Sequence, residues 1–314
     1  MLSLLKNQNG FTKTSFSGND VVSKILEQFM TGKSHDVNRN GSAADSSSKP
    51  FGLSIFFPVY NDWGTIGTMV SLAVMTAEKI TPDYEVILVN DGSQPQTREI
   101  LDFLEKKFPA VRVVHHEKNR GYGGALKSGF KAARKDFIFY TDGDAQYDVR
   151  ELLNLVPAMK NGVDVVNGYK IKRHDPWYRI WIGKLYHTVT RFAFSFTIRD
   201  VDCDFRLLRR ELFDRIQLER NSGVICVEMI KKLHDIGAYF VEVPVHHFFR
   251  ASGKSEFFNF RRVFRVGIDV TKLWWHLVFL KRFNRSADNA ALAATPNSRS
   301  EARPRHKVHR EQKV

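Results

Sequence analysis

The segment FIFYTDGDAQYD, residues 137–148, decides the fold class because it joins a buried strand to a polar loop. Its first four residues are β-branched or aromatic, which is typical of a strand inside a sheet. Asp142, Asp144 and Gln146 follow at once, where that strand would leave the sheet. Ligands of open α/β sheets bind at the carboxyl ends of strands, so we expect a binding site here.

The side chains of Asp142, Asp144 and Gln146 alternate along the loop, so an extended turn can project them to one side. Their carboxylate and amide oxygens suit a hard divalent cation, Mg²⁺ or Mn²⁺. Such an ion keeps open positions for substrate phosphates. The alternative is an ordinary turn, because Asp and Gly are both common turn residues. This segment alone does not separate the two interpretations.

Strand and helix patterns alternate around this segment. Apolar runs at 53–57, 85–89, 111–114 and 163–166 predict further strands, with helices at about 65–80, 95–107, 125–134 and 149–160. This order predicts an α/β fold with a mostly parallel sheet and helices on both faces. Right-handed crossovers place the strands' carboxyl ends on one rim. The polar clusters at 58–62, 91–93 and 142–146 should therefore converge there.

Composition restricts the class of protein. The chain has 314 residues, of which 43% are hydrophobic, and this is ample for a packed domain. A net charge of +14 permits nucleic acid, an anionic membrane or phosphorylated substrates as partners. Two cysteines form no disulfide framework and fit a reducing cytosol. Neither a membrane span nor a signal peptide is recognisable, so we expect a cytosolic location or a peripheral one on the cytosolic face of a membrane.

The pattern changes along the chain predict four regions. Residues 1–50 read as a flexible extension with a short amphipathic helix at about 20–31, and 51–256 as the α/β domain. Residues 257–285 predict basic, aromatic amphipathic helices, and 286–314 a disordered basic tail. Stripes of aromatics beside Arg and Lys at 177–196 and 260–278 are typical of helices in a membrane interface. The alternative for both stripes is an ordinary helix that faces the core.

Seven short motifs occur in a fixed order. They are PVYND at 58–62, VNDGS at 89–93, NRGYGGALK at 119–127, DGDAQ at 142–146, CDFR at 203–206, EVPV at 242–245 and RASGKS at 250–255. Each is weak alone, but the ordered set resembles the family 2 glycosyltransferases of the GT-A fold, which is Rossmann-like. Within them it looks most like the polyprenyl-phosphate glycosyltransferases, the group of dolichyl-phosphate mannose synthase. The resemblance covers about residues 52–270.

The resemblance implies a donor site and a metal site. The nucleotide-binding positions that carry over are Pro58, Tyr60, Asp62, Asp91, Gly121, Gly124, Lys127 and Gly143. Asp62 stands where the family commonly has Glu, which is one methylene longer. The glycines have an alternative interpretation, since they can simply shape a tight turn. The metal ligands that carry over are Asp142, Asp144 and Gln146, with Mg²⁺ or Mn²⁺ as the cofactor.

The same resemblance implies the groups that act on phosphates. Arg250 matches an arginine that approaches the donor diphosphate, and a planar guanidinium suits that role. Lys254 and Ser255 would assist with phosphate binding, although Glu256 stands where the family often has Lys. In the acceptor loop, Asp200 is expected beside the acceptor phosphate.

Three carboxylates crowd the acceptor loop, at Asp200, Asp202 and Asp204. Asp202 is the alternative catalytic carboxylate, and Arg206 completes the acceptor motif. Such crowding is costly unless cations neutralise it. The arginines close enough in sequence to do so are Arg199, Arg206, Arg209 and Arg210. We expect Glu228, on the following helix, to orient this loop. The alternative is an ionic cluster that caps a strand.

These features predict a metal-dependent, inverting transfer of a hexose from a GDP- or UDP-sugar to dolichyl or undecaprenyl phosphate. The expected partners are the nucleotide sugar, the polyprenyl phosphate, a membrane surface and a membrane-anchoring subunit. One alternative is a glycolipid, polysaccharide or protein acceptor. Another is a basic nucleic-acid- or membrane-binding protein without catalysis. No nucleic acid is expected as a partner, because the basic residues gather in the aromatic helices and the tail rather than in a reader motif.

Overall fold

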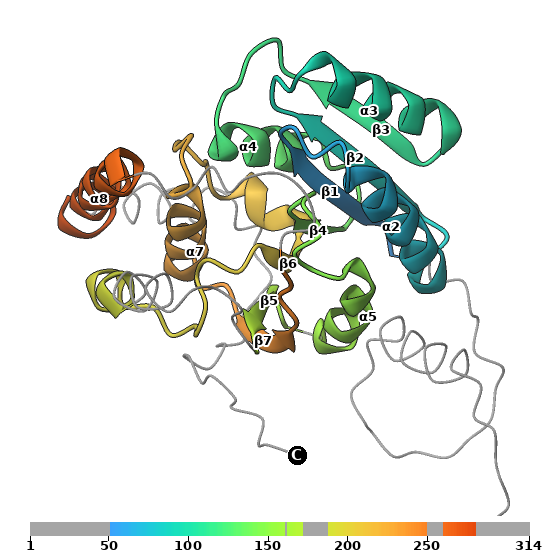
Figure 1. Cartoon of the computed structure of the whole chain (residues 1–314). Coiled ribbons are helices and arrows are strands. Elements are labelled where there is room, and N and C mark those ends of the chain that lie inside the picture. Colours follow the sequence, from blue (N-terminus) through green and yellow to red (C-terminus); the bar gives the residue numbers. More distant parts are fainter. Residues whose placement is uncertain (1–50, 161, 172–187, 250–259, 281–314) are drawn as a thin grey trace, which may run out of the picture. The chain divides into compact units, whose positions relative to one another are not determined.

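The computed structural model describes residues 51–160, 162–171, 188–249 and 260–280 (Figure 1). The chain divides into two compact units, Met1–Ser48 and Lys49–Val314, and every described residue belongs to the second. Several predictions lie outside the described residues. They are the helix at 20–31, the start of the aromatic stripe at 177–196, the phosphate-binding group Arg250, Lys254 and Ser255, and the tail at 286–314.

The described residues form seven strands and the helices between them. The strands are β1 (Leu53–Val59), β2 (Tyr84–Asn90), β3 (Val111–His115), β4 (Phe137–Thr141), β5 (Val165–Lys170), β6 (Phe205–Arg209) and β7 (Phe240–Val245). The α-helices are α2 (Ile66–Ile80), α3 (Pro95–Lys107), α4 (Tyr122–Ala132), α5 (Leu152–Leu155), α7 (Ile225–Asp235) and α8 (Phe260–Trp274). Shorter turns of other helix types are η1 (Val149–Glu151), η2 (Val156–Ala158), η3 (Arg210–Asp214) and η4 (Trp275–Phe279).

The strands form one sheet in the order β3-β2-β1-β4-β6-β5-β7. β6 runs antiparallel to both of its neighbours, whereas the other paired strands are parallel. The predicted mostly parallel α/β sheet is therefore confirmed. β1 and β4 pair in parallel at the centre, with Phe56 opposite Tyr140, so the loops that follow β1, β2 and β4 leave the same rim.

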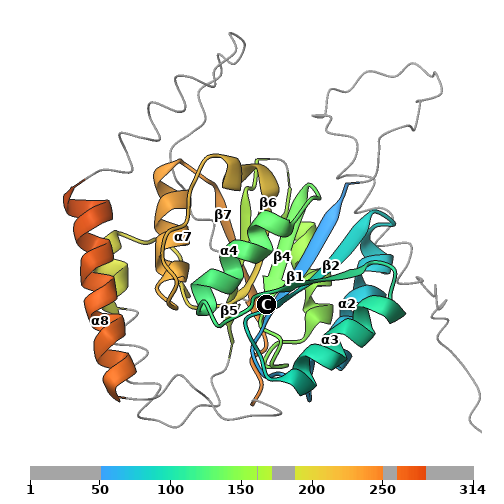
Figure 2. The ribbon, with the colours of Figure 1, turned by 90° about the horizontal axis from the view of Figure 1, so that it is seen from above.

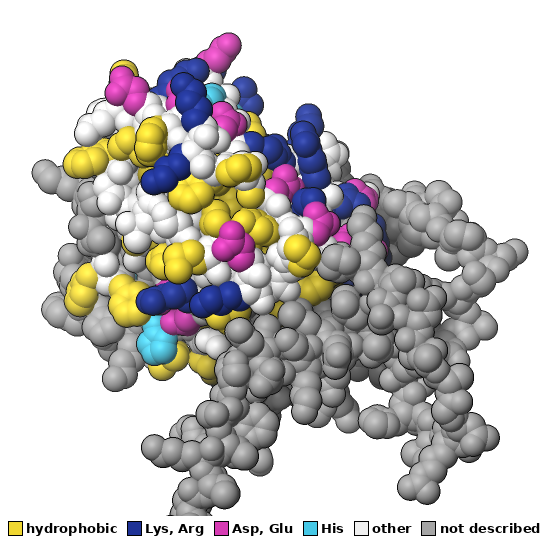
Figure 3. All heavy atoms as spheres, turned by 90° about the vertical axis from the view of Figure 1, so that its right-hand side faces the viewer, with side chains coloured by type: hydrophobic (Ala, Val, Ile, Leu, Met, Phe, Trp, Pro, Cys, Tyr) yellow, Lys and Arg dark blue, Asp and Glu magenta, His cyan; other side chains and the backbone are white. Residues whose placement is uncertain are grey.

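Helices cover both faces of this sheet, as predicted (Figure 2). On one face α4 and α7 enclose Phe56, Ile87 and Tyr140 in a continuous apolar core. Burial of such side chains is the main favourable term in folding. On the other face α2 packs on β1 and β2 and contacts α3 and α5. The face beside α2 and α3 mixes apolar side chains with charges of both signs (Figure 3).

Three local predictions differ from the structure. The strand expected at 163–166 begins at Val165, and the helix expected at 149–160 is split into η1, α5 and η2. Pro157 contributes to that split because it lacks the N–H that a continuous helix needs. The strand β6 was not predicted, because its sequence FRLLR places an arginine where a core strand would carry an apolar residue.

The second aromatic stripe lies on α8 and η4, within the predicted region 257–285. Leu273 and Leu277 are buried in the main core, whereas Ile268, Trp275 and Phe279 are exposed. The core-facing interpretation therefore holds for Leu273 and Leu277, and the membrane-interface interpretation of the exposed side stays a prediction. None of the helices in the described part of the chain combines the length and hydropathy needed to cross a bilayer.

Candidate functional site

Hydrogen bonds to main-chain atoms of the loop after β4 help to hold its conformation. The Thr65 hydroxyl donates to the Gly143 carbonyl oxygen at 2.7 Å, and the Gln146 N–H donates to Asp144 Oδ1 at 3.1 Å. Ala145 has φ +60°, a left-handed conformation that costs a residue with a Cβ about 1–2 kcal/mol. Strain of this kind is often kept where a loop must present side chains in a fixed direction.

Asp142 lies among other carboxylates, whose negative charges act on it. Its Oδ1 accepts a hydrogen bond from the Tyr122 hydroxyl at 2.9 Å. Burial raises the pKa of Asp142 well above its usual range, and the charges of Asp204 and Asp144 raise it further. The Tyr122 hydrogen bond opposes this shift. A bound cation would relieve the same repulsion and hold Asp142 ionised.

The donors at this point fit a hard divalent cation. Asp142 and Asp144 offer carboxylate oxygens, which Mg²⁺ and Mn²⁺ prefer. Within the described ranges no cluster of three or more His, Cys, Asp or Glu side chains is arranged to hold a metal. Asp142 and Asp144 are the carboxylates that would hold such a cation. The third predicted ligand, Gln146, donates its amide to the Phe248 carbonyl oxygen at 3.2 Å.

The predicted donor residues of β1 and β2 meet at the same rim. The Tyr60 N–H donates to Asp62 Oδ2 at 3.1 Å, and the Tyr60 ring is exposed. The two loops interlock, because the Asn61 N–H donates to Ser93 Oγ at 3.1 Å. Asp62 also contributes to the raised pKa of Asp142, so the β1 loop and the β4 loop are electrostatic neighbours.

Asp91 is buried, and its carboxylate has protein partners. Oδ1 lies 2.7 Å from His116 Nδ1 and accepts the Arg120 N–H at 2.8 Å. His116 Nε2 lies 2.8 Å from the Ser128 hydroxyl. Asp91 thus ties the end of β2 to the start of α4. The predicted contact between Asp91 and the donor nucleotide stays a prediction.

The glycine-rich loop has a close structural neighbour that sequence reasoning missed. Gly121 opens α4 with φ +81°, and the Gly123 N–H donates to the Asn221 carbonyl oxygen at 2.8 Å. A Cβ on Gly123 would lie 2.4 Å from the Arg220 carbonyl oxygen. These glycines therefore allow the main chain of 220–221 to approach. Gly124 and Lys127 line a hollow on α4 whose lining includes neither Asp142 nor Asp144.

The acceptor loop enters the site immediately before β6. Asp200 is buried, and its Oδ2 lies 3.9 Å from Lys170 Nζ. Lys170 also donates to the Asp202 carbonyl oxygen at 3.1 Å. Lys170 was not predicted as a site residue; it ends β5, and a lysine at a strand terminus carries no signal in the sequence alone.

Of the four arginines that are close enough in sequence to neutralise the acceptor loop, Arg206 pairs with one of its carboxylates in the described part of the chain. Arg206 pairs with Asp204 at 3.6 Å. The other three pair with carboxylates outside the loop: Arg199 with Glu242, Arg209 with Asp164, and Arg210 with Asp214. Arg206 and Arg209 lie on β6 and Arg210 begins η3, so their side chains are directed to different neighbours.

Arg206 lies in the interior of the domain, where its side chain is fully buried. Its guanidinium donates to Asn167 Oδ1 at 2.6 Å, to the Tyr140 hydroxyl and to the Val201 carbonyl oxygen. A contact between Arg206 and an acceptor phosphate would require these bonds to open. The arrangement suits a residue that fixes the acceptor loop against β4 and β5.

Glu228 orients a different loop from the one expected. Its carboxylate accepts the N–H groups of Glu219 and Arg220, each at 2.9 Å, and pairs with Lys232 at 2.7 Å. Glu228 is 1% exposed, so this is a buried, charge-assisted cluster. Through it α7 holds the 219–221 segment against the start of α4.

Asp202 gives a pH-dependent prediction. Burial and the charge of Asp200 raise the pKa of Asp202 to about 6, from 3.8. The folded state therefore holds this proton to higher pH than the unfolded state does. The stability contributed by Asp202 is complete below about pH 4 and is lost as the pH rises through 6.

Asp202→Asn should therefore be more stable than the wild type at pH 8 by roughly 3 kcal/mol, and the difference should vanish near pH 4. Urea denaturation at both pH values in the presence of EDTA measures it. The exposed Asp214 supplies the control, since Asp214→Asn should show little change at either pH. An Asp202→Asn effect that is equal at the two pH values would contradict the assignment.

Comparison with known families agrees with the geometry of this rim. The sequence model described as "Glycosyl transferase family 2" matches residues 54–217, more than half of the chain. The chain belongs to glycosyl transferase family 2. The match includes β1 to β6 and thus both the loop after β4 and the acceptor loop.

Two curated relatives in this family are similar over most of the chain. Glycosyltransferase AglD of Haloferax volcanii is 29% identical over 242 residues, which are 74% of this chain and 38% of AglD. Undecaprenyl-phosphate 4-deoxy-4-formamido-L-arabinose transferase of an Enterobacter species is 27% identical over 220 residues, 69% of this chain and 66% of that protein. The chain thus spans less than two thirds of the length of either relative.

Solved structures share the fold. Glucosyl-3-phosphoglycerate synthase from Mycobacterium tuberculosis, crystallised with Mn²⁺, uridine diphosphate and phosphoglyceric acid, superposes with a TM-score of 0.57. It is 13% identical, and the match covers 87% of this chain and 83% of that one. At this identity the likeness shows the fold alone.

Proposed function

We propose that this chain transfers a hexose, with inversion, from a GDP- or UDP-sugar to a polyprenyl phosphate, with a divalent cation bound at Asp142 and Asp144. The observation that carries the proposal is the approach of two loops from distant parts of the sequence. Thr141, which precedes the loop after β4, pairs with Phe205, which follows the acceptor loop, and the charge of Asp204 raises the pKa of Asp142. A donor site and an acceptor site can therefore share one reaction centre.

On the donor side, the exposed Tyr60 ring is available for the base. A cation at Asp142 and Asp144, when bound, would offset the charge of the departing nucleoside diphosphate. The Mycobacterium tuberculosis enzyme was crystallised with Mn²⁺ and uridine diphosphate together, which supports this choice of ligand class. Arg250, outside the described residues, is proposed to contact the same diphosphate.

On the acceptor side, the Asp200 carboxylate with Lys170 beside it forms a polar pair of opposite charges. A phosphate monoester has a second pKa of about 6, so its oxygen is largely ionised at neutral pH and needs no strong base. We therefore assign Asp200 the task of positioning the acceptor, with Lys170 offsetting the phosphate charge. The Enterobacter relative is named an undecaprenyl-phosphate transferase, which supports a polyprenyl phosphate as the acceptor class.

The proposal extends to peripheral membrane binding through α8 and η4 at the cytosolic face. Ile268, Trp275 and Phe279 are exposed, while Leu277 anchors the same segment in the core. The exposed cation Lys272 lies on the same segment and suits an anionic surface. This arrangement would bring the acceptor loop to its lipid substrate.

Membrane binding gives a direct prediction. The double variant Trp275→Ser and Phe279→Ser should bind anionic vesicles at least tenfold more weakly, because two aromatic rings leave the interface. Flotation with phosphatidylglycerol vesicles measures the bound fraction. The matched control is Met75→Ser with Phe103→Ser, which removes two similarly exposed side chains from α2 and α3. Equal loss in both doubles would argue against α8 as the docking segment.

The function itself is tested by a screen of labelled nucleotide sugars with Mn²⁺ or Mg²⁺ and a short polyprenyl phosphate. The expected result is a lipid-linked sugar from one GDP- or UDP-sugar, formed with inversion and lost in EDTA. A glycolipid, a polysaccharide and a protein are offered as competing acceptors in parallel reactions. Transfer to one of these, with polyprenyl phosphate inert, would overturn the proposed acceptor.

A further inference from the structure

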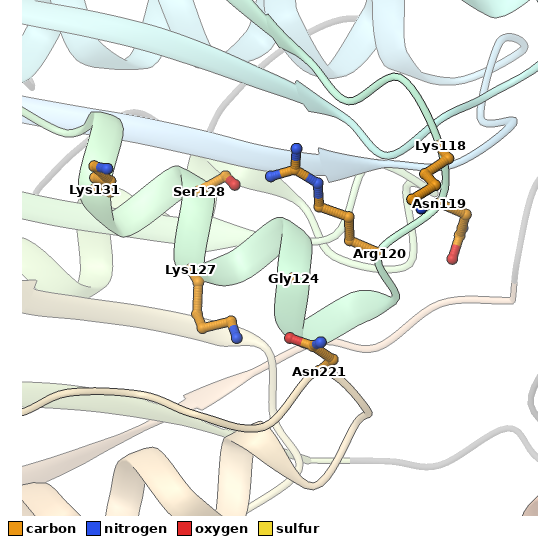
Figure 4. Close-up of a pocket in the computed structure, with 8 residues that line it drawn as sticks. All are labelled: Lys118, Asn119, Arg120, Gly124, Lys127, Ser128, Lys131 and Asn221. Atoms are coloured by element: carbon orange, nitrogen blue, oxygen red, sulfur yellow. The ribbon is translucent and has the colours of Figure 1, made fainter.

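A hollow of about 550 Å³ opens on the surface of α4 (Figure 4). Eight residues line it, of which four are cationic: Lys118, Arg120, Lys127 and Lys131. None of the eight is acidic. The volume lies in the range of sites that hold small molecules, which is about 300–1,000 Å³. The hollow is therefore large enough for a ligand, and half of its lining residues are cationic.

The cations of this hollow have no acidic partner among the described residues that would neutralise them. None of the salt bridges found among the described residues includes one of the four cations that line the hollow. Lys127 Nζ donates to the Glu219 carbonyl oxygen at 3.0 Å, a neutral partner that leaves its charge in place. Four like charges around one hollow repel one another, and an anion would relieve that repulsion.

A chain of polar contacts leads from Ser128, which lines the hollow, to Asp91. Ser128 lies 2.8 Å from His116 Nε2, and His116 Nδ1 lies 2.7 Å from Asp91 Oδ1. Because the Asp91 carboxylate accepts, Nδ1 carries a proton, and the Ser128 hydroxyl is engaged with Nε2. The charged groups available to an anion in the hollow are the lysine and arginine side chains.

Arg120 connects the hollow to the end of β2. Its N–H donates to Asp91 Oδ1 at 2.8 Å, while its guanidinium extends over α4 toward Ser128 (Figure 4). A guanidinium and several ammonium groups together match the oxygens of a phosphate. We propose that this hollow is a second binding site, for a phosphate-bearing anion, distinct from the site that would hold the donor diphosphate and metal.

The test compares two double variants with the same loss of charge. Lys118→Gln with Lys131→Gln removes two cations from the hollow, and Lys79→Gln with Lys106→Gln removes two exposed cations from α2 and α3. Tripolyphosphate is titrated into each by calorimetry in EDTA, so that no metal mediates binding. We expect at least a tenfold loss of affinity in the first double and less than a twofold loss in the second.

A second arm separates a soluble ligand from a lipid headgroup. Sedimentation with phosphatidylglycerol or phosphatidylcholine vesicles is measured for the same two doubles. A selective loss with tripolyphosphate identifies a soluble phosphate compound, and a selective loss with phosphatidylglycerol alone identifies a headgroup. The proposal is overturned if the two doubles behave alike in both arms. Each readout is binding, so the outcome does not depend on whether the proposed transfer reaction is correct.

A third measurement uses the wild-type chain and does not depend on the folding of any variant. Lysine acetylation read by mass spectrometry should show protection of Lys118 and Lys131 by tripolyphosphate. Lys79 and Lys106 should react at unchanged rates. Equal protection at all four lysines would indicate non-specific association and would reject the site.

Discussion

Asp144→Asn is expected to reduce sugar transfer by roughly 10³-fold, because it removes one of two carboxylates proposed to hold the cation. Asp144 is 3% exposed and lies between Gly143 and the strained Ala145. Loss of one negative charge should also weaken cation binding. A melting-temperature shift on adding Mn²⁺ with a nucleoside diphosphate measures that effect separately, since a ligand stabilises only the state that binds it.

The matched control for Asp144 is Asp148→Asn in the same loop. Asp148 caps η1 and pairs with the exposed Arg150 at 2.6 Å, so it serves local structure. Its replacement should leave the rate within about threefold and should preserve the thermal shift with Mn²⁺. Full activity of Asp144→Asn, or undiminished wild-type activity in excess EDTA, would refute the metal assignment.

Arg206→Ala is expected to lower the free energy of unfolding by about 3–5 kcal/mol, which is the usual cost of removing one partner of a buried ion pair. The Asp204 carboxylate would lose its cation at 3.6 Å, and Asn167 Oδ1 would lose its donor at 2.6 Å. Asn167 is fully buried and Asp204 is mostly buried, and an unsatisfied polar atom in such surroundings is costly. Urea denaturation of the full chain measures the loss.

Arg210→Ala provides the comparison for Arg206. Arg210 lies four residues further on and forms an exposed pair with Asp214 at 3.2 Å. Pairs of that kind contribute about 0–1 kcal/mol, so the control should be nearly as stable as the wild type. If Arg206→Ala unfolds at the same urea concentration as Arg210→Ala, Arg206 does not hold the acceptor loop in the way described.

The sheet was predictable from sequence because its central strands are nearly continuous apolar runs separated by helical patterns. The runs at 137–140, 53–57 and 85–89 each form a strand whose ends lie within two residues of the predicted bounds. β6 could not be predicted in this way. Its arginine at 206 is buried by partners on β4, β5 and the acceptor loop, and these lie up to 66 residues away in the sequence.

The candidate site was predictable in outline for a similar reason. Loops at the carboxyl ends of neighbouring parallel strands must meet, so the approach of Asp62 to Asp142 follows from topology. The pairing of Asp200 with Lys170 does not follow, because it requires knowledge that β6 lies between β4 and β5. The packing of Gly123 on Asn221 could not be predicted either, because the two residues lie far apart in the sequence and no local pattern links them.

The register of β4 with β6 limits how the reaction centre can move. Thr141 is paired with Phe205, so the last residue before the carboxylate loop and the first residue after the acceptor loop are cross-strand neighbours. The two loops thus start from one residue pair of the sheet, so they cannot move apart unless that pairing breaks. Any opening of the site during turnover must therefore come from segments other than β4 and β6, and not from motion of these two strands relative to each other.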